Sequence, residues 1–207
     1  MDDASQYSIR SYQASDRVAV RKLCCETGFL GSPIDPVFQD RELFADFLTT
    51  YYTDHEPESS FVLEIDGQIR GYLLGSRKFV RWVIGHGWHE VPAAPRSVPH
   101  FHINLLPDAR KVSTTRALMS AYLNYLYRFG ERHVYGQIVT FESRRGEKLF
   151  ERYGFKVLNR AEITKWKAFY PKSVYLSTVI KTLETAGPLS AYSRRQTSSA
   201  PVVLRPS

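Results

Sequence analysis

The chain has 207 residues, of which 43% are hydrophobic and 14% aromatic, and its formal net charge is +7. This length predicts one well-packed domain, and no apolar run approaches the roughly 18 residues of a membrane span, which excludes a membrane-spanning protein. The first residues lack the layout of a secretory signal, and the two cysteines, Cys24 and Cys25, are adjacent, so we expect a cytoplasmic protein without disulfides.

The positive charge is too diffuse to indicate nucleic-acid binding. Residues 184–207 carry three arginines and one glutamate, a charge of +2, which leaves +5 for the rest of the chain. No stripe of basic residues interleaved with aromatic ones appears. The six histidines are scattered and no acidic cluster has ligand spacing, so no metal site is expected either.

The N-terminal part predicts a strand and two helices. Residues 7–13 alternate weakly, as a strand does, and Ser15 and Asp16 offer N-caps for a helix that ends near residue 26. Asp40 caps a second helix with an aromatic side, which we expect to pack against a sheet.

A hairpin and a long loop follow. Residues 61–65 and 68–74 are strand-like, and the dipeptide Asp66-Gly67 between them is the strongest short hairpin signal available in a sequence. Residues 78–85 could extend the second strand, whereas residues 86–99 contain three prolines and should form a long surface loop. The side chains of this stretch that could line a cleft are Trp82, His86, Trp88, His89 and Glu90.

Residues 100–129 are the stretch around which the rest is organised. A buried strand over 100–106 stops at Pro107, and a basic turn leads into a long amphipathic helix. The first backbone N–H groups of a helix are unpaired and its dipole favours negative charge, so such a turn is an anion site. Arg110, Lys111 and Arg116 flank it.

The C-terminal part completes the sheet. We expect a strand over 133–141, a short helix over 143–152 and an antiparallel pair over 155–166 and 174–183. The element order predicts an α/β (α+β) domain over residues 1–183, with a mixed, mainly antiparallel sheet of about seven strands and helices on both faces. Residues 184–207, rich in Ser, Pro and Arg, should form a disordered or surface-draped tail.

Three motifs, whose order and spacing along the chain match the family, resemble the GNAT superfamily of acetyl-CoA-dependent N-acetyltransferases, over residues 7–183. LLPDARKVSTTRAL is similar to the family's strand, proline and Arg/Gln-x-x-Gly-x-Gly/Ala turn, SRRGEKLFERYGF occupies the place of its later motif, and FVLEIDGQIRGYLLG looks like its second and third strands. The resemblance implies transfer of acetyl from acetyl-CoA to a primary amine of a small molecule or protein, by a protein that could form a homodimer. The alternative is a non-catalytic CoA-binding or protein-interaction module.

The resemblance also implies where acetyl-CoA binds. A backbone N–H near Leu105 or Leu106 would meet the thioester carbonyl, and the turn would hold the pyrophosphate. Ser113 and Thr115 stand where the family has glycine, so their side chains could crowd the pyrophosphate or donate hydroxyl hydrogen bonds to it. The implied cofactor-binding residues are Leu105, Leu106, Arg110, Lys111, Val112, Ser113, Thr114, Thr115, Arg116 and Ser143, the last in place of an asparagine.

The catalytic residues implied by the resemblance are less complete. Phe150 stands where many members have a tyrosine that protonates the departing thiolate, so the acid must be water or another residue. For the base, His102 and His100 precede the cofactor position, and Glu142 ends the following strand. Counted back from Arg110, the histidines are one residue out of register, which predicts the opposite face of the sheet unless a bulge intervenes.

Overall fold

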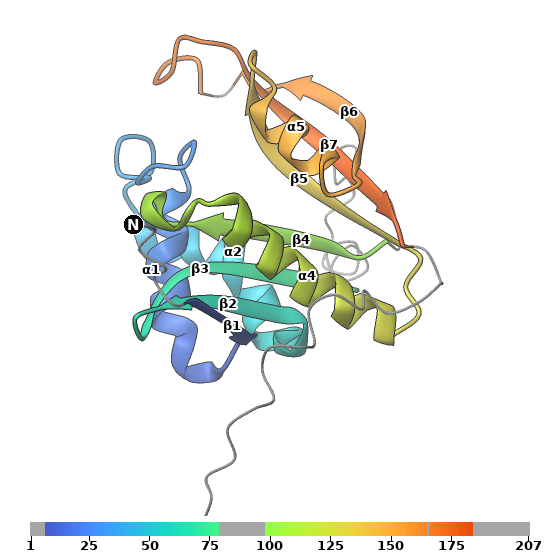
Figure 1. The fold of residues 1–207 in the computed structure, drawn as a ribbon. Coiled ribbons are helices and arrows are strands. Elements are labelled where there is room, and N and C mark those ends of the chain that lie inside the picture. The colour runs from blue at the N-terminus through green and yellow to red at the C-terminus, as the bar shows by residue number, and fades with distance from the viewer. Residues whose placement is uncertain (1–6, 79–97, 165, 184–207) are drawn as a thin grey trace, which may run out of the picture.

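A seven-stranded sheet in the order β1-β2-β3-β4-β5-β7-β6 organises the protein, with helices on both of its faces (Figure 1). The computed structural model describes residues 7–78, 98–164 and 166–183. Five pairs of neighbouring strands are antiparallel, and in four of them the two strands are consecutive in the chain. Among the described strands, only β4 and β5 pair in parallel. The predicted fold class is confirmed. The proposed cleft residues between Trp82 and Glu90 and the tail after Leu183 lie outside the described residues.

The N-terminal strand and two helices form as expected. β1 (Tyr7–Ser11) is followed by a single 3-10 turn, η1 (Ala14–Asp16), and then by α1 (Arg17–Thr27). Asp16 is the N-cap residue of α1, as predicted, but its carboxylate accepts hydrogen bonds from Arg10 and makes no capping bond to the helix. α2 (Arg41–His55) is capped as predicted, because the Asp40 carboxylate accepts a hydrogen bond from the Leu43 N–H at 2.9 Å.

The hairpin is confirmed. The 3-10 turn η2 (Pro57–Ser59) leads into β2 (Ser60–Ile65), which pairs with β3 (Gln68–Ser76). Asp66 and Gly67 have φ of 51° and 74°, which is the left-handed geometry that a tight hairpin turn requires at both central residues.

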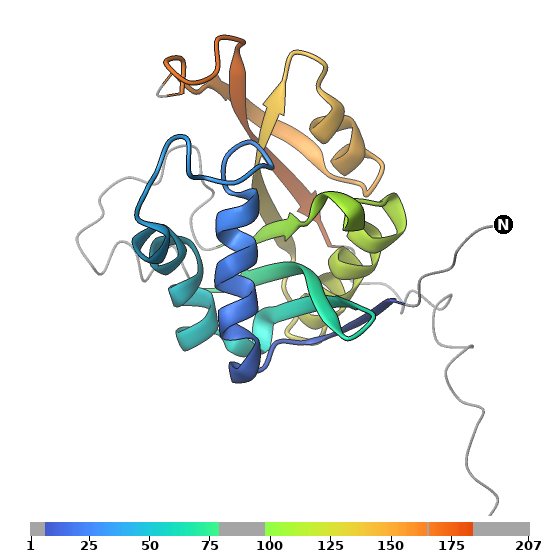
Figure 2. The same ribbon diagram turned by 90° about the vertical axis from the view of Figure 1, so that its left-hand side faces the viewer.

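Two layers of helix enclose the first half of the sheet. α1 and α2 cover one face (Figure 2). Their apolar side chains pack there on Val62, Tyr72 and Leu74. The other face is covered by α4 (Val112–Arg128), whose Leu118 and Tyr122 belong to a separate core cluster. Between these layers runs β4 (His100–Leu105), in the middle of the sheet as expected, and the 3-10 turn η3 (Pro107–Ala109) joins it to α4.

The C-terminal elements extend away from this body in Figure 1. β5 (His133–Phe141), α5 (Arg145–Glu151), β6 (Lys156–Glu162) and β7 (Val174–Thr182) form as predicted in order, although α5 and β6 are shorter than expected. Gly154, with φ of 81°, follows α5 as the predicted left-handed residue. Among the helices that the structure describes, none combines the length and the apolar character that crossing a membrane would require.

Candidate functional site

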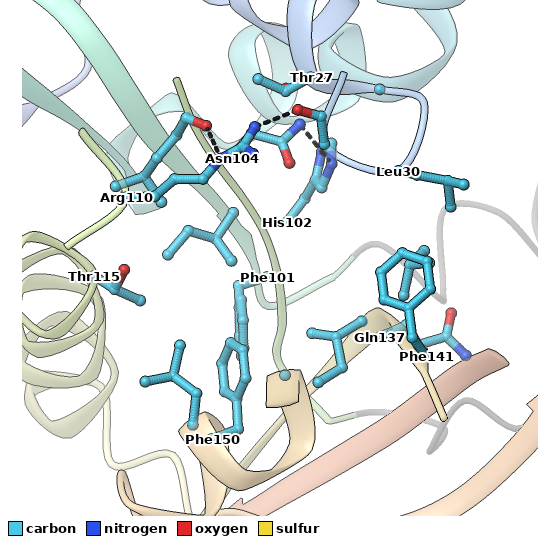
Figure 3. A pocket seen from close by; sticks show the side chains of 18 of the residues that line it. Thr27, Leu30, Phe101, His102, Asn104, Arg110, Thr115, Gln137, Phe141 and Phe150 are labelled. Carbon is cyan, nitrogen blue, oxygen red and sulfur yellow. Dashed lines mark hydrogen bonds between the residues drawn. The ribbon is translucent and has the colours of Figure 1, made fainter. Parts of the chain in front are cut away.

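The candidate site lies where β4 and β5 separate. The described pairing between these parallel strands consists of His100 with Tyr135 and Phe101 with Gly136, after which the strands diverge. A cavity of about 450 Å³ occupies the gap, and Figure 3 shows the side chains that line it. An opening between two central strands exposes backbone groups that a continuous sheet would have used.

The backbone of β4 presents such groups to the gap. The Leu106 N–H donates to the Arg70 carbonyl at 2.9 Å, on the β3 side. Hydrogen-bonding direction alternates along an antiparallel ladder, so Ile103 and Leu105 turn their N–H groups the other way, toward β5. Of the two candidates for meeting a thioester carbonyl, Leu105 therefore faces the cavity, and the Leu106 N–H is already bonded.

The cavity passes from one face of the sheet to the other. At one end it is bounded by α5 and by the N-terminus of α4, including Lys111, Val112 and Thr115. At the other end it is bounded by α2 and by the loop after α1. Side chains of β5 form the wall between them, and the cavity-lining residues of that strand are Gln137, Ile138, Val139 and Phe141.

The first turn of α4 has the properties of an anion site. The Thr115 N–H donates to the Lys111 carbonyl at 3.1 Å. The N–H groups of residues 112–114 precede this bond and lie at the positive end of the helix dipole. Lys111, Ser113 and Arg116 are exposed around this turn. The arrangement favours a phosphate-like group there.

The threonine hydroxyls of this turn are used internally. The buried Thr114 hydroxyl donates to the Ala109 carbonyl at 2.6 Å, and the Thr115 hydroxyl donates to the Lys111 carbonyl at 3.1 Å. They brace the turn and are committed to carbonyls of the chain itself. Of the three hydroxyls around the turn, that of Ser113 is the exposed one.

Arg110 connects the two ends of the cavity. Its Nε donates to the Leu105 carbonyl at 2.8 Å, and its guanidinium also donates to the carbonyl of Gly31, in the loop after α1. A Cβ at Gly31, where φ is 86°, would lie 3.0 Å from the Arg110 guanidinium. The side chain therefore fastens the α1–α2 loop to the end of β4 while lining the cavity.

The structure separates the candidate bases. His102 lines the cavity, and burial lowers the pKa of His102 to about 4 against a smaller opposite effect of its hydrogen bond to the backbone of Leu48. His100 is buried below the cavity, where its Nε2 lies 2.6 Å from the Tyr52 hydroxyl, and burial lowers the pKa of His100 to about 3. Both are therefore neutral imidazoles at neutral pH.

The histidine register agrees with the count from the sequence. The β3–β4 register runs without a shift from Gly71 opposite Leu105 to Ser76 opposite His100, so the described strand has no bulge. His102 shares the α1–α2 face with Tyr72, whose ring centroid is 5.6 Å away. It nevertheless lines the cavity, because the gap between β4 and β5 opens on that face as well.

Besides His100 and, on the first turn of α4, Ser113, Thr114 and Arg116, three further predicted residues lie outside the cavity lining. Glu142 is exposed after β5, and its carboxylate accepts a hydrogen bond from the Tyr175 hydroxyl. Ser143, the next residue, is also exposed. Leu106 packs at the edge of the core cluster under α1 and α2.

Phe150 forms part of the cavity wall and of the core. Its ring stacks on Phe101 with a centroid distance of 5.8 Å, and its side chain is 5% exposed. The nearby Tyr153 packs against the same core, while its hydroxyl donates to the Val112 carbonyl at 3.2 Å, on the first turn of α4. Burial raises the pKa of Tyr153, so this hydroxyl keeps its proton.

Several lining residues were missed by the sequence interpretation. Asn104 donates to the Tyr72 hydroxyl at 2.9 Å, and its amide nitrogen lies 3.4 Å from His102 Nε2. Its position two residues after His102 on one strand could have identified it. Leu30, Leu48 and Gln137 reach the cavity from separate elements, and no local pattern marks them.

Within the described ranges, the structure holds no group of three His, Cys, Asp or Glu side chains that could bind a metal ion. No family model matches the sequence. No curated protein matches it either.

Solved structures do match the fold. The crystal structure of SsHAT is 25% identical in sequence, with a TM-score of 0.65 over 88% of this chain and 100% of that one. The acetyltransferase of the GNAT family from Streptococcus pneumoniae has a TM-score of 0.58 at 15% identity, over 86% of this chain and 100% of its own. The yncA protein of Salmonella typhimurium, solved with its cofactor acetyl-CoA, has a TM-score of 0.60 at 15% identity, over 89% and 98% of the two chains.

Proposed function

From the GNAT fold of this chain, we propose that it is an N-acetyltransferase that moves the acetyl group of acetyl-CoA to a primary amine. The observation that carries this proposal is the through-sheet cavity. It combines N–H groups of β4 that point into the gap toward β5 with an anion site at the N-terminus of α4. An extended amide chain that ends in a pyrophosphate matches both features.

In the proposed complex, the pantetheine arm lies along β4 in the gap. Its amides pair with the backbone of Ile103, as an added strand would, and the Leu105 N–H is left for the thioester carbonyl. The pyrophosphate lies against the N–H groups of residues 112–114, with Lys111 and Arg116 supplying charge and Ser113 a hydroxyl. Thr114 and Thr115 contribute by bracing the turn.

The reaction we propose is direct transfer. The amine nitrogen attacks the thioester carbon, the C–N bond forms, the C–S bond breaks, and CoA leaves as a thiolate. The Leu105 N–H stabilises the negative charge that develops on the carbonyl oxygen. A thiol of pKa about 8.5 is a moderate leaving group that water can protonate, which suits a site with Phe150 in its wall.

His102 is the proposed hydrogen-bond acceptor for the attacking amine. Its neutral ring lines the cavity on the face away from α4, and its hydrogen bond to the backbone of Leu48 orients it. In the proposed complex, Nε2 accepts from the amine in place of the long contact of 3.4 Å with the Asn104 amide nitrogen. Because its pKa is about 4, the ring is a weak base. We therefore assign the proton's final transfer to solvent.

Calorimetry with CoA and a thiol-release assay with an amine panel test this function. We expect CoA to bind, and Lys111→Glu to weaken it about tenfold, or roughly 1.4 kcal/mol, because the variant places a negative charge beside the pyrophosphate. Lys22→Glu, on the exposed side of α1, makes the same change in net charge and should leave CoA affinity unchanged. No CoA binding at millimolar concentration would contradict the proposal.

The second candidate function is a non-catalytic CoA-binding module. It is favoured by Phe150, which cannot donate a proton. CoA binding with no thiol release from any amine or protein lysine would support it over the acetyltransferase.

A further inference from the structure

Resting on the proposed function, we infer that the acceptor is a monoamine with an apolar body, which packs against Leu30 and Leu48. The reacting amine would point into the gap toward His102. The rest of the acceptor would occupy the end of the cavity away from α4.

The walls at that end are apolar. Leu30 comes from the loop after α1 and Phe141 from the end of β5, and Figure 3 shows both at the cavity. Leu48, from α2, lines the same cavity. The polar side chains beside them, Thr27, His102, Asn104 and Gln137, carry no charge at neutral pH. An alkyl or aryl group buried here would gain roughly 25 cal/mol for each Å² of apolar surface removed from water.

The charges around the cavity disfavour a second ammonium group. Both charged side chains among the described lining residues are cations, Arg110 and Lys111. A diamine bound in this orientation would bury its distal ammonium against leucine side chains and near Arg110, whose guanidinium reaches the Gly31 carbonyl beside Leu30. Desolvation of that ammonium would oppose binding.

The backbone at Leu30 supports a role for its side chain. Leu30 has φ of 54°, in the left-handed region, which costs a residue with a Cβ about 1–2 kcal/mol. Asparagine, aspartate or glycine would fit this position with less strain. The large apolar side chain nevertheless stands here, in the cavity wall, and neighbouring Gly31 is held in place by Arg110. Strain of this kind is concentrated at functional sites.

Two matched amines test the inference. Hexylamine and hexamethylenediamine have the same chain and differ in one terminal amine. We expect the wild-type protein to use hexylamine with a kcat/KM at least about tenfold higher, and hexylamine to bind more tightly to the CoA-saturated protein in ligand-observed NMR. Equal values for the two amines, or a preference for the diamine, would overturn the inference.

The variant Leu30→Asp places a carboxylate in this wall at a backbone position that aspartate tolerates well. It should raise the ratio of diamine to monoamine kcat/KM by about tenfold, through pairing with the distal ammonium. Leu30→Asn introduces a side chain of the same shape as aspartate without the charge. It should lower kcat/KM for hexylamine without favouring the diamine. Identical ratios in the two variants would contradict the assignment of Leu30, and if Leu30→Asp does not fold, the wild-type comparison remains decisive.

The two hypotheses fail in different ways. Hexylamine bound in preference to the diamine but never acetylated would leave the inferred binding site intact and contradict the proposed activity. Acetylation of both amines without preference would support the proposed activity and contradict the inferred binding site. Absence of hexylamine binding to the CoA-saturated protein overturns the inference.

Discussion

At the scale of single residues, two buried histidines couple the fold to pH. The pKa of His100 is lowered to about 3 and that of His102 to about 4 by burial, whereas in the unfolded chain both would titrate near their ordinary value of about 6.5. Below that pH the unfolded state binds protons that the folded state excludes. Stability from these two residues is therefore complete above about pH 6.5 and is lost as the pH falls toward the folded values.

We predict that the free energy of unfolding in urea falls between about pH 6.5 and pH 5, by at most about 1.4 kcal/mol per pH unit for each histidine. The double variant His100→Gln, His102→Gln should show a shallower fall, since glutamine does not titrate. The variant His133→Gln removes an exposed histidine at the start of β5 and should keep the wild-type slope. Equal slopes in the wild type and the double variant would show that burial does not lower the pKa of these two histidines.

Arg110 binds backbone carbonyls of the chain itself, a different role from the one its motif implies. The motif implies a cofactor contact, whereas its guanidinium binds the carbonyls of Leu105 and Gly31. Burial lowers the pKa of Arg110, which remains a cation under any physiological condition. Its two hydrogen bonds link the end of β4 to the loop that carries Leu30.

At the scale of elements, α5 is attached to the sheet through one buried carboxylate. Glu147 is 0% exposed, and it pairs with Arg144 and with Arg160, whose Nε lies 3.2 Å from its Oε1. Burial by itself would raise the pKa of Glu147, but hydrogen bonds from Ser177 and Arg144 hold it below its usual range. The helix, which supplies Leu149 and Phe150 to the cavity wall, thus depends on an ion pair with β6 and a hydrogen bond to β7.

The variant Glu147→Ala should lower the free energy of unfolding by about 1–3 kcal/mol, because it removes the buried carboxylate that Arg160 and the Ser177 hydroxyl bind. CoA affinity should fall with it, since α5 forms part of the cavity wall. Chemical denaturation and calorimetry measure the two effects. Glu151→Ala removes an exposed carboxylate from the same helix and should change neither quantity by much. A loss below about 1 kcal/mol in Glu147→Ala would show that this ion-pair network contributes little.

At the scale of the whole molecule, the described core ends at Leu183. Its side chain is 2% exposed in the cluster under α4, and its N–H donates to the Arg132 carbonyl at 2.8 Å. We therefore propose a domain boundary directly after this residue, as the change in composition predicted.

A chain shortened to end at Leu183 should keep the melting temperature and CoA affinity of the full chain. A chain that ends at Leu176 loses most of β7, which pairs with both β5 and β6, and should not fold. Thermal unfolding and CoA calorimetry on the two shortened chains and the full chain compare these cases. A large drop in melting temperature for the first shortened chain would place part of residues 184–207 in the folded domain.

The sequence by itself determined the elements of this protein. The Asp66-Gly67 turn, the Asp40 cap, the stop at Pro107 and the left-handed Gly154 all appear where they were predicted. Each depends on a backbone preference or a hydrogen bond within a few residues, which is the range over which sequence patterns carry information. The order of these elements was then sufficient to indicate the fold class.

Only the tertiary structure decided the site. The bond from Arg110 to Gly31 joins residues 79 positions apart, and Leu30, His102 and Phe141 meet because three separate elements end around one gap. That gap exists because β5 pairs with β7 along its whole length but with β4 at only two described positions. The extent of such pairing follows from the packing of distant elements, which no local spacing in the chain encodes. Whether His102 or His100 reached the cavity was settled in the same way, by where β4 leaves its neighbour.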